Sequence, residues 1–489
     1  MSKVLLCIPP DYDYNFPPLA TPALSAFLKQ HNITTSQIDL NLGYRSFLLD
    51  HVRGKKLSAA MKEDLLKDIL SEFYSKRLKK RYYSGFLPGS SDRVSLNLPY
   101  DNNTNSSFYF TERLLSSSHL FRYLDDECEN TFLQFYRKRN IIGRLKRDKI
   151  DILGISIISP SQVIAGLTLG LLVKREIPSI HVNIGGQWPT LYRGQIIKAQ
   201  DLFRCFDSVI VFEGETPLLN LARALKTNAP LRIRNVITKG SLDDFSLNRS
   251  QEDMDSLPAP DFKGLPLSKY LGSPGRNRGL TFETSRGCYW SKCAYCVDLP
   301  LPKPAYRSKN AKLVVRDMLE LRENFKATNL LFGDPGLSPR SMLDISRMIL
   351  KKGLKIGWWT MARLDPGFTR EIFDTAFRAG LSQINFGFES ASDRVCGLLH
   401  KGNNKERSQR VIRDCSMAGI KVDLQTMIGL PNETFQDGLE TVDFLVSNKE
   451  FIDDVTFNIY YLTPANYIFN DPGRYNIKYA REAGLPFRF

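Results

Sequence analysis

Short apolar runs alternate with longer amphipathic stretches through the second half of the chain. Runs rich in β-branched or aromatic residues, typical of strands, occupy 279–285, 329–333, 354–359, 383–388, 421–428 and 455–461. Segments with helical periodicity separate several of them, at 311–324, 340–352, 369–379 and 404–418. Six strands alternating with helices predict an α/β fold, a parallel and partly open (β/α)6 barrel over residues 279–489.

The first half has a similar alternation, but over fewer strands. Apolar runs predict strands at 3–8, 151–157, 179–184 and 208–212, and a helix is predicted at 20–30. Together these elements predict a Rossmann-like α/β domain over residues 1–235. Residues 236–278 are predicted to be a linker, because Pro punctuates their centre at 255–261.

Residues 45–148 match neither pattern and are predicted to be a largely helical insertion in the first domain. Helical periodicity covers 57–80 and returns, with aromatic and basic residues, at 121–147. Between them, 84–118 is rich in Ser, Asn, Asp, Gly and Pro. Two interpretations stay open for the insertion, a substrate lid and a cover for the sheet.

Composition fits an ordinary globular chain. The 489 residues are 42% hydrophobic, which favours two or three domains at ~150 residues per domain. No apolar run approaches the ~20 residues of a membrane span, and eight scattered cysteines do not form a secreted disulfide framework. We therefore expect a cytoplasmic location. The net charge of +15 comes from dispersed basic residues, so a solvated basic surface is favoured over a nucleic-acid partner.

Three cysteines, Cys288, Cys293 and Cys296, lie close together just after the strand predicted at 279–285. No other Cys occurs between Cys205 and Cys396, and no His between His181 and His400. Structural zinc needs four ligands, whereas an iron–sulfur cluster held by three thiolates leaves one iron open to substrate. The ligands also follow the carboxyl end of a strand, where active sites of parallel β/α folds form. This pattern predicts a catalytic cluster.

The cysteine motif resembles that of the radical S-adenosylmethionine (radical SAM) superfamily, Cys-x-x-x-Cys-x-x-Cys, except that four residues fill the first gap here. The resemblance implies a [4Fe–4S] cluster on the three cysteines and SAM bound beside it. It also implies SAM contacts at the ends of later strands and at the cysteine loop. The residues that match are Asp334 for the ammonium, Glu389 for the ribose, and Tyr295 and Ile428 near adenine, whereas Arg363 and Lys401 would neutralise the carboxylate or orient Glu389.

Some of these residues have ordinary structural roles as alternatives. Asp334 stands beside Gly and Pro, where Asp commonly caps a turn or helix. Arg363 and Lys401 fit surface salt bridges as well. An ionised Glu389 at the end of an apolar strand needs a hydrogen-bonding partner, which ribose hydroxyls provide.

The first domain resembles the cobalamin-binding domain that precedes the barrel in cobalamin-dependent radical SAM enzymes. Small and polar residues follow two of its strands, where a large ligand would cross the carboxyl edge of the sheet. They are Gly185, Gly186, Gln187, Glu213 and Gly214. The Asp-x-His-x-x-Gly motif that supplies an axial histidine to cobalt is absent from the sequence, and Phe212 stands where glycine is frequent. A domain kept as a scaffold, or binding another ligand, is the alternative.

The resemblance implies a cobalamin-dependent radical SAM C-methyltransferase acting on an unactivated carbon of a peptide or natural product. An external one-electron reductant of flavodoxin or ferredoxin type would be required. Cyclisation or rearrangement without methylation is an alternative in the same family. A tRNA-modifying enzyme is disfavoured because Cys7, Cys128 and Cys205 are too widely separated for a second cluster. A non-enzymatic cobalamin module would not explain the open cluster motif.

Overall fold

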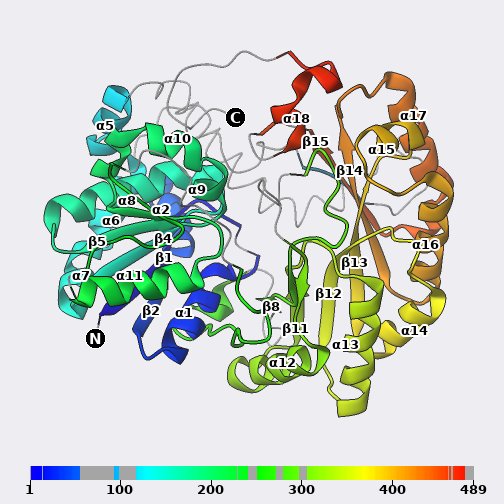
Figure 1. Cartoon of the computed structure of the whole chain (residues 1–489), viewed down its shortest axis with the longest axis horizontal. Helices are drawn as coiled ribbons and strands as arrows, with labels where there is room; N and C mark the ends of the chain where they lie inside the picture. Colours follow the sequence, from blue (N-terminus) through cyan, green and yellow to red (C-terminus); the bar gives the residue numbers. More distant parts are fainter. Residues whose placement is uncertain are drawn as a thin grey trace. The chain divides into compact units, whose positions relative to one another are not determined.

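The computed structural model describes residues 2–13, 15–54, 93–97, 117–227, 229–240, 251–270, 279–296, 305–460, 462–463 and 466–478. They form two compact units. The first contains residues 2–54 and 117–270, and the second contains 93–97 and 279–478. Each unit has its own sheet with helices against it (Figure 1). The predicted mixed α/β class with parallel sheets is confirmed.

The sheet of the first unit has six strands in the order β2-β1-β4-β5-β6-β7. All neighbours are parallel except β6 and β7. The order reverses between β1 and β4, which makes a topological switch point at the carboxyl edge. The strands are β1 (Lys3–Ile8), β2 (Thr34–Asp39), β4 (Ile152–Ser156), β5 (His181–Gly185), β6 (Ser208–Ile210) and β7 (Val236–Thr238).

Helices cover both faces of this sheet, and a hydrophobic cluster lies on each side. The helices are α1 (Ala20–Gln30), α2 (Asn41–Gly54), α5 (Ser117–Asp125), α6 (Thr131–Lys138), α7 (Ile141–Asp148), α8 (Val163–Glu176), α9 (Gln187–Leu191), α10 (Arg193–Lys198) and α11 (Glu215–Thr227). Helices α5, α6 and α7 come from the predicted insertion. Phe132 and Tyr136 of α6 are buried in the larger cluster, and the Tyr136 hydroxyl donates to the Ala165 carbonyl of α8 at 3.0 Å. This part of the insertion therefore covers the sheet, whereas the helix predicted at 57–80 lies outside the described residues.

Part of the predicted linker is also fixed to the first unit. The Tyr270 hydroxyl donates to the buried Asp39 carboxylate at 2.5 Å, and the Gln37 amide donates to the Asp261 carbonyl at 2.7 Å. Met254 and Leu257 pack into the smaller hydrophobic cluster. Residues 251–270 thus lie along the unit as a packed segment.

The second unit contains a seven-stranded sheet in the order β3-β15-β14-β13-β12-β11-β8, and every neighbouring pair is parallel. All six strands predicted for the barrel are present. They are β8 (Gly279–Phe282), β11 (Asn329–Phe332), β12 (Gly357–Arg363), β13 (Leu381–Glu389), β14 (Lys421–Ile428) and β15 (Asp454–Ile459). The seventh, β3 (Arg93–Asn97), comes from the polar stretch of the insertion, where no strand was predicted.

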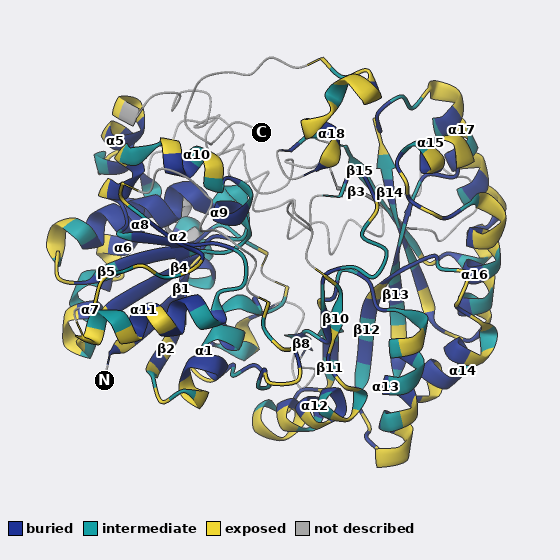
Figure 2. Cartoon of the chain, viewed as in Figure 1, coloured by how far each residue is buried: buried dark blue, intermediate teal, exposed yellow. Residues whose placement is uncertain are grey.

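Apart from α18 (Tyr467–Asn470), which packs against residues 293–295, the helices of the second unit lie along one face of its sheet (Figure 1). They are α12 (Ala311–Phe325), α13 (Pro339–Lys352), α14 (Arg370–Arg378), α15 (Asp393–Leu398), α16 (Lys405–Met417) and α17 (Phe435–Ser447). Figure 2 shows the resulting alternation of burial along the strands. In β13, Ile384, Phe386 and Phe388 are fully buried, whereas Gln383 and Asn385, on the other face, are partly exposed. Strands β9 (Ser285–Arg286) and β10 (Arg307–Ser308) pair antiparallel as a separate two-stranded sheet.

Strand β12 lies a few residues later in the chain than the sequence predicted. The strand begins at Gly357 and continues to Arg363, whereas the sequence predicted it at 354–359. Leu354 and Ile356 are buried in the connection before the strand, so they look like strand residues in the sequence. In the strand itself Trp358, Thr360 and Ala362 alternate as buried residues. The shift puts Arg363 at the carboxyl end.

None of the helices that the structure describes is long and apolar enough to cross a membrane.

Candidate functional site

The cysteine loop follows the carboxyl end of β8 and is anchored by backbone hydrogen bonds. Cys293 is buried, whereas Cys288 and Cys296 are partly exposed, and none of the three forms a disulfide. The Ala294 N–H donates to the Leu399 carbonyl at 3.0 Å, and the Ala294 carbonyl accepts from Tyr467 at 3.1 Å. An apolar cluster supports the loop, made up of Cys293, Ala294, Tyr295, Val395, Leu399, Leu430, Ile468 and Tyr475. The loop is thus held in place by residues after α15 and at α18.

Trp290, one of the four residues in the first gap, connects this loop to the segment after α15. Its indole N–H donates to the His400 carbonyl at 2.8 Å. Its ring lies over Gly402, where a Cβ would come within 2.1 Å of a ring carbon. Gly402 also has φ +80°, a conformation that favours glycine. Neither Trp290 nor Gly402 was singled out from the sequence, although the widened gap itself was the available signal.

Arg363 brings a buried positive charge to the same loop. Its side chain donates to the Cys293 sulfur at 3.5 Å and, through the second terminal nitrogen, to the Lys401 carbonyl. Its guanidinium carbon lies 4.7 Å from the centre of the Trp290 ring. Arg363 is only 7% exposed, so the surface salt bridge is wrong for it. Its Nε has no hydrogen-bond partner among the described residues, which leaves one buried donor for a ligand.

Lys401 and Glu389 form a buried ion pair beside the cysteine loop. The Lys401 ammonium donates to Glu389 Oε1 at 2.8 Å and to the Tyr295 hydroxyl at 2.9 Å. The two side chains are 6% and 12% exposed, so the surface alternative is wrong for Lys401 too. Burial, together with the Glu389 carboxylate, raises the pKa of Tyr295 well above its ordinary value. Tyr295 is therefore a neutral phenol within this group.

The backbone around Glu389 is irregular in a way that favours this pairing. The register between β13 and β14 shifts between Gly387 and Glu389, and Glu389 has φ +69°. A Cβ at Gly387 would come within 2.9 Å of the Lys401 nitrogen and 3.0 Å of Glu389 Oε1. The glycine therefore leaves the space that the ion pair occupies, and the bulge directs Glu389 to it.

Asp334 lies just after β11, fully buried, and binds the strand end that leads into the cysteine loop. Its carboxylate accepts from the Thr284 N–H at 2.8 Å, the Thr284 hydroxyl at 2.7 Å and the Ser285 N–H. Both oxygens are thus engaged by Thr284 and Ser285. The structure supports a positioning role, close to the capping alternative, and the predicted contact with the SAM ammonium stays a prediction. Burial raises the pKa of Asp334 to about 7, although the hydrogen bonds from Thr284 and Ser285 oppose this.

This raised pKa gives a testable pH dependence. Because the folded state holds the proton more tightly than the unfolded chain, the contribution of Asp334 to stability is present below its ordinary pKa of 3.8 and is lost as the pH rises through about 7. We expect the apoprotein to lose thermal stability over that range, and Asp334→Asn to remove part of the slope. Midpoints of thermal unfolding against pH measure this. Asp344→Asn, on the exposed side of α13, should leave the slope unchanged; equal slopes for wild type and Asp334→Asn would contradict the prediction.

Ile428 ends β14 and is 38% exposed, at the edge where the other candidate residues lie. The next residues form a fixed loop, because Glu433 accepts from the Gly429 and Leu430 N–H groups at 2.7 and 3.1 Å. Gly429 has φ +74°. The predicted contact of this segment with adenine stays a prediction.

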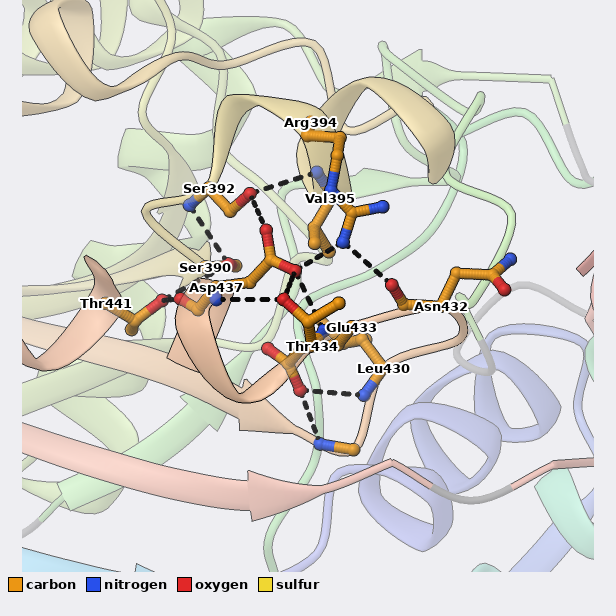
Figure 3. A network of polar contacts seen from close by, with 11 residues as sticks. Ser390, Ser392, Arg394, Val395, Leu430, Asn432, Glu433, Thr434, Asp437 and Thr441 are labelled. Atoms are coloured by element: carbon orange, nitrogen blue, oxygen red, sulfur yellow. Dashed lines mark hydrogen bonds and ion pairs between the residues drawn. The ribbon is translucent and has the colours of Figure 1, made fainter. Parts of the chain in front are cut away.

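A hydrogen-bond network around Asp437 joins the segment after β13 to the start of α17 (Figure 3). Asp437 accepts from Ser392 at 2.6 Å and from the Thr434 hydroxyl at 2.6 Å, and it pairs with Arg394. Burial raises the pKa of Asp437, but the hydrogen bonds from these three residues outweigh it, so the pKa lies well below its ordinary value. The ionised carboxylate therefore fixes the loops at the ends of β13 and β14.

The donor set fits an iron–sulfur cluster and SAM. Three cysteines that form no disulfide lie on one anchored loop, Arg363 has a buried Nε without a hydrogen-bond partner among the described residues, and Gly387 leaves room beside Glu389. No three His, Cys, Asp or Glu side chains of the described residues converge as a site for one metal ion. A [4Fe–4S] cluster makes a different demand, since each thiolate binds a different iron.

In the first unit, the residues predicted to bind cobalamin lie at the carboxyl edge of the sheet. Gly185 ends β5, Gly186 follows with φ +111°, and Gln187 begins α9. A Cβ at Gly186 would come within 2.4 Å of the Ile157 carbonyl oxygen, so the strand ends approach too closely for any other residue. A large ligand at this edge would meet backbone there.

Glu213 and Gly214 follow β6 at the same edge. A Glu213 oxygen accepts from the Glu252 N–H at 2.9 Å, so its side chain binds the packed segment of the linker. Phe212 has φ +64°, which explains why glycine suits this position, and its N–H donates to the Thr190 hydroxyl at 2.9 Å. The sequence did not single out Thr190.

Three histidines of the first unit, His31, His119 and His181, can be compared with this edge of the sheet. His181 is at the amino end of β5, where it hydrogen-bonds Ser208 at 2.8 Å. His31 follows α1, and His119 is in α5. None of these three follows the carboxyl end of a strand.

Comparison with known proteins agrees with the geometry of the second unit. Residues 282–445, which run from the end of β8 into α17, match the Radical SAM superfamily. The chain contains a radical SAM domain. Members of this superfamily use a [4Fe–4S] cluster and SAM, and the matched segment includes the cysteine loop, Asp334, Arg363, Glu389 and Lys401.

Relatives extend over more of the chain. An uncharacterised methyltransferase of Pyrococcus horikoshii is 25% identical over 320 residues, which cover 64% of this chain and 68% of that protein. An anaerobic magnesium-protoporphyrin IX monomethyl ester cyclase of Rubrivivax gelatinosus is 26% identical over 303 residues, 60% of this chain and 53% of the cyclase. This match spans about half the length of the cyclase.

A solved structure resembles the fold of both units. It is the radical S-adenosylmethionine methyltransferase TsrM from Kitasatospora setae, with cobalamin and a [4Fe–4S] cluster bound. The TM-score is 0.61 at 15% identity, over 96% of this chain and 74% of TsrM. The likeness therefore concerns the fold of the chain.

Proposed function

We propose that this protein is a cobalamin-dependent radical SAM methyltransferase that methylates an unactivated carbon of a peptide or natural product. The observation that carries the proposal is the gathering of the cysteine loop, Arg363 and the Lys401–Glu389 pair at the carboxyl ends of β8, β12 and β13. Cobalamin is included because the first unit has the fold of a protein that binds it.

When bound, the cluster and SAM would supply a 5′-deoxyadenosyl radical that abstracts hydrogen, and cobalamin would supply a methyl group. The protein contributes binding, orientation and exclusion of water. Cys288, Cys293 and Cys296 would hold the cluster through their thiolates, and the three-cysteine motif would leave one iron without a protein ligand and so available to SAM. An external one-electron donor of flavodoxin or ferredoxin type would provide the electron.

The side chains around the loop would orient SAM. The spare Nε–H of Arg363 would donate to the SAM carboxylate, a charge-assisted hydrogen bond in a buried setting. Glu389, fixed by Lys401, would accept from the ribose hydroxyls. Tyr295 and Ile428 would lie near adenine. Asp334 would act mainly by fixing the strand end before the cysteines, with its contact to the SAM ammonium still to be tested.

In the first unit, Gly185, Gly186 and Gln187 would border the cobalamin, together with Glu213 and Gly214. The close approach of Gly186 to Ile157 leaves no room for a side chain at position 186. The Asp-x-His-x-x-Gly motif is absent, and His31, His119 and His181 do not follow the carboxyl end of a strand, so we propose that no histidine of the first unit ligates cobalt.

Absorbance spectra of the anaerobically reconstituted protein test the proposal. After incubation with cobalamin and removal of unbound cofactor, we expect near-stoichiometric bound cobalamin without the spectral signature of histidine ligation. Turnover should then yield both S-adenosylhomocysteine and 5′-deoxyadenosine. An intact iron–sulfur band with no bound cobalamin would contradict the cobalamin part and leave the radical SAM part standing.

A cyclisation or rearrangement is the second candidate, because one relative is named as a cyclase. Product analysis separates the two. Bound cobalamin with 5′-deoxyadenosine but no S-adenosylhomocysteine would favour this candidate over methylation.

A further inference from the structure

The widened gap of the cysteine motif has a structural counterpart in Trp290. Ser291, the next residue, has φ +53°, a left-handed conformation within the four-residue gap. The indole is fixed by its hydrogen bond to the His400 carbonyl and by the space above Gly402. The ring is therefore held in one position, and a neighbouring cation can contact one of its faces.

That cation is Arg363. The Trp290 ring and the Lys401 carbonyl hold the guanidinium, and its remaining terminal nitrogen donates to the Cys293 sulfur. Burial strengthens each of these contacts, since a guanidinium over an aromatic face gains most when it is desolvated. Arginine keeps its charge under all ordinary conditions, so the cluster loop carries a permanent positive charge next to one thiolate.

A hydrogen-bond donor and a positive charge beside the Cys293 thiolate would affect the one-electron reduction of the cluster. Hydrogen bonds to cluster sulfurs and the local charge are among the factors that set the reduction potential. Reduction adds one negative charge to the cluster, and a cation beside a thiolate stabilises the reduced form more than the oxidised form. The electron comes from the low-potential donor of the proposed function, and no bond is formed or broken.

We propose that Trp290 holds Arg363 against the Cys293 thiolate and that Arg363 thereby raises the reduction potential of the cluster. This assigns Arg363 a positioned electrostatic role before SAM binds, and it assigns Trp290 a positioning role. The inference rests on the proposed function only in requiring that the three cysteines hold a cluster.

Redox titration without SAM tests the inference, because it leaves out any role of Arg363 in binding SAM. The reconstituted wild type and variants are titrated anaerobically and followed by electron paramagnetic resonance, with iron content measured for each. We expect Arg363→Gln to lower the equilibrium constant for reduction about tenfold, a potential about 59 mV more negative for one electron. Arg363→Lys should lie between the two, since it keeps the charge and loses the planar donor.

Lys292→Gln is the matched control. Lys292 is an exposed cation on the same loop, 4.8 Å from the Trp290 ring, and no hydrogen bond joins it to Cys293 among the described contacts. Its removal should shift the potential much less than Arg363→Gln. Equal potentials for these two variants would overturn the inference.

Trp290 variants test whether Trp290 holds Arg363 in place. They also provide a second test of the inference if the Arg363→Gln variant fails to bind a cluster. Trp290→Leu removes the aromatic face, and Gly402→Ala displaces the ring by its added Cβ. Both should move the potential in the direction of Arg363→Gln, whereas Trp290→Phe, which keeps a face, should move it less. Wild-type potentials in Trp290→Leu would overturn the role of Trp290. A wild type without any cluster would overturn the proposed function itself, a result distinguishable from unchanged potentials.

Discussion

Replacing Cys293 with alanine is expected to abolish SAM cleavage while the first unit stays folded. The three cysteines lie on one short loop, and no additional His, Cys, Asp or Glu of the described residues completes a metal site with them. Two thiolates would then have to hold the cluster. We expect SAM cleavage to fall below detection. This loss is larger than the ~10–100-fold typical of mutating residues that only hydrogen-bond to a metal ligand.

Measurement of 5′-deoxyadenosine, together with iron and sulfide content, checks this result. Cys415→Ala is a suitable control, because Cys415 is also buried in the second unit but lies in α16, away from the loop. It should bind a cluster and cleave SAM at the wild-type level. Sustained 5′-deoxyadenosine production by the Cys293→Ala variant would contradict the assignment of the cluster ligands.

Periodic burial explains why the second unit could be predicted well. Its strands alternate buried and partly exposed residues, as in β13, and they are separated by helices with one apolar face. Those patterns are local, so the sequence shows them. Because the strands are parallel, their carboxyl ends share one edge, and residues predicted there are indeed brought together, as Arg363, Glu389 and the cysteine loop are.

Strands made of polar residues were missed. In β2, Thr34 to Gln37 include four polar residues in a row, and the strand exists because it pairs with β1 at the edge of the sheet. The same holds for β3, which lies in a polar stretch and pairs with β15. Tertiary pairing, rather than local hydrophobicity, forms these strands.

Contacts between residues far apart in the chain were the other feature that the sequence did not predict. Asp334 was predicted to bind a ligand, whereas its oxygens bind Thr284 and Ser285, about 50 residues earlier. The contact of Trp290 with His400 spans 110 residues. A sequence gives the type of each residue but not which distant side chain or backbone group it contacts in the fold. Roles could therefore be proposed for these residues, but their contacts could not be predicted.

The second large effect is expected from Lys401→Met, which would leave Glu389 as a buried charge without its cation. Both side chains are nearly buried, so we expect the second unit to lose about 3–5 kcal/mol of stability. Urea unfolding of the apoprotein measures this through tryptophan fluorescence, because Trp290, Trp358 and Trp359 lie in this unit and Trp188 in the other.

The double variant Glu389→Gln/Lys401→Met separates stability from ligand binding. Removing both charges eliminates the uncompensated carboxylate, so the double variant should regain most of the stability that the single variant loses. Its affinity for SAM should still be reduced at least about tenfold, roughly 1.4 kcal/mol, because the ionised acceptor for the ribose hydroxyls is gone. Equilibrium dialysis of the reconstituted proteins measures this affinity. Wild-type binding of SAM by the stable double variant would show that the ion pair only supports the fold, whereas weakened binding would assign Glu389 to the cofactor.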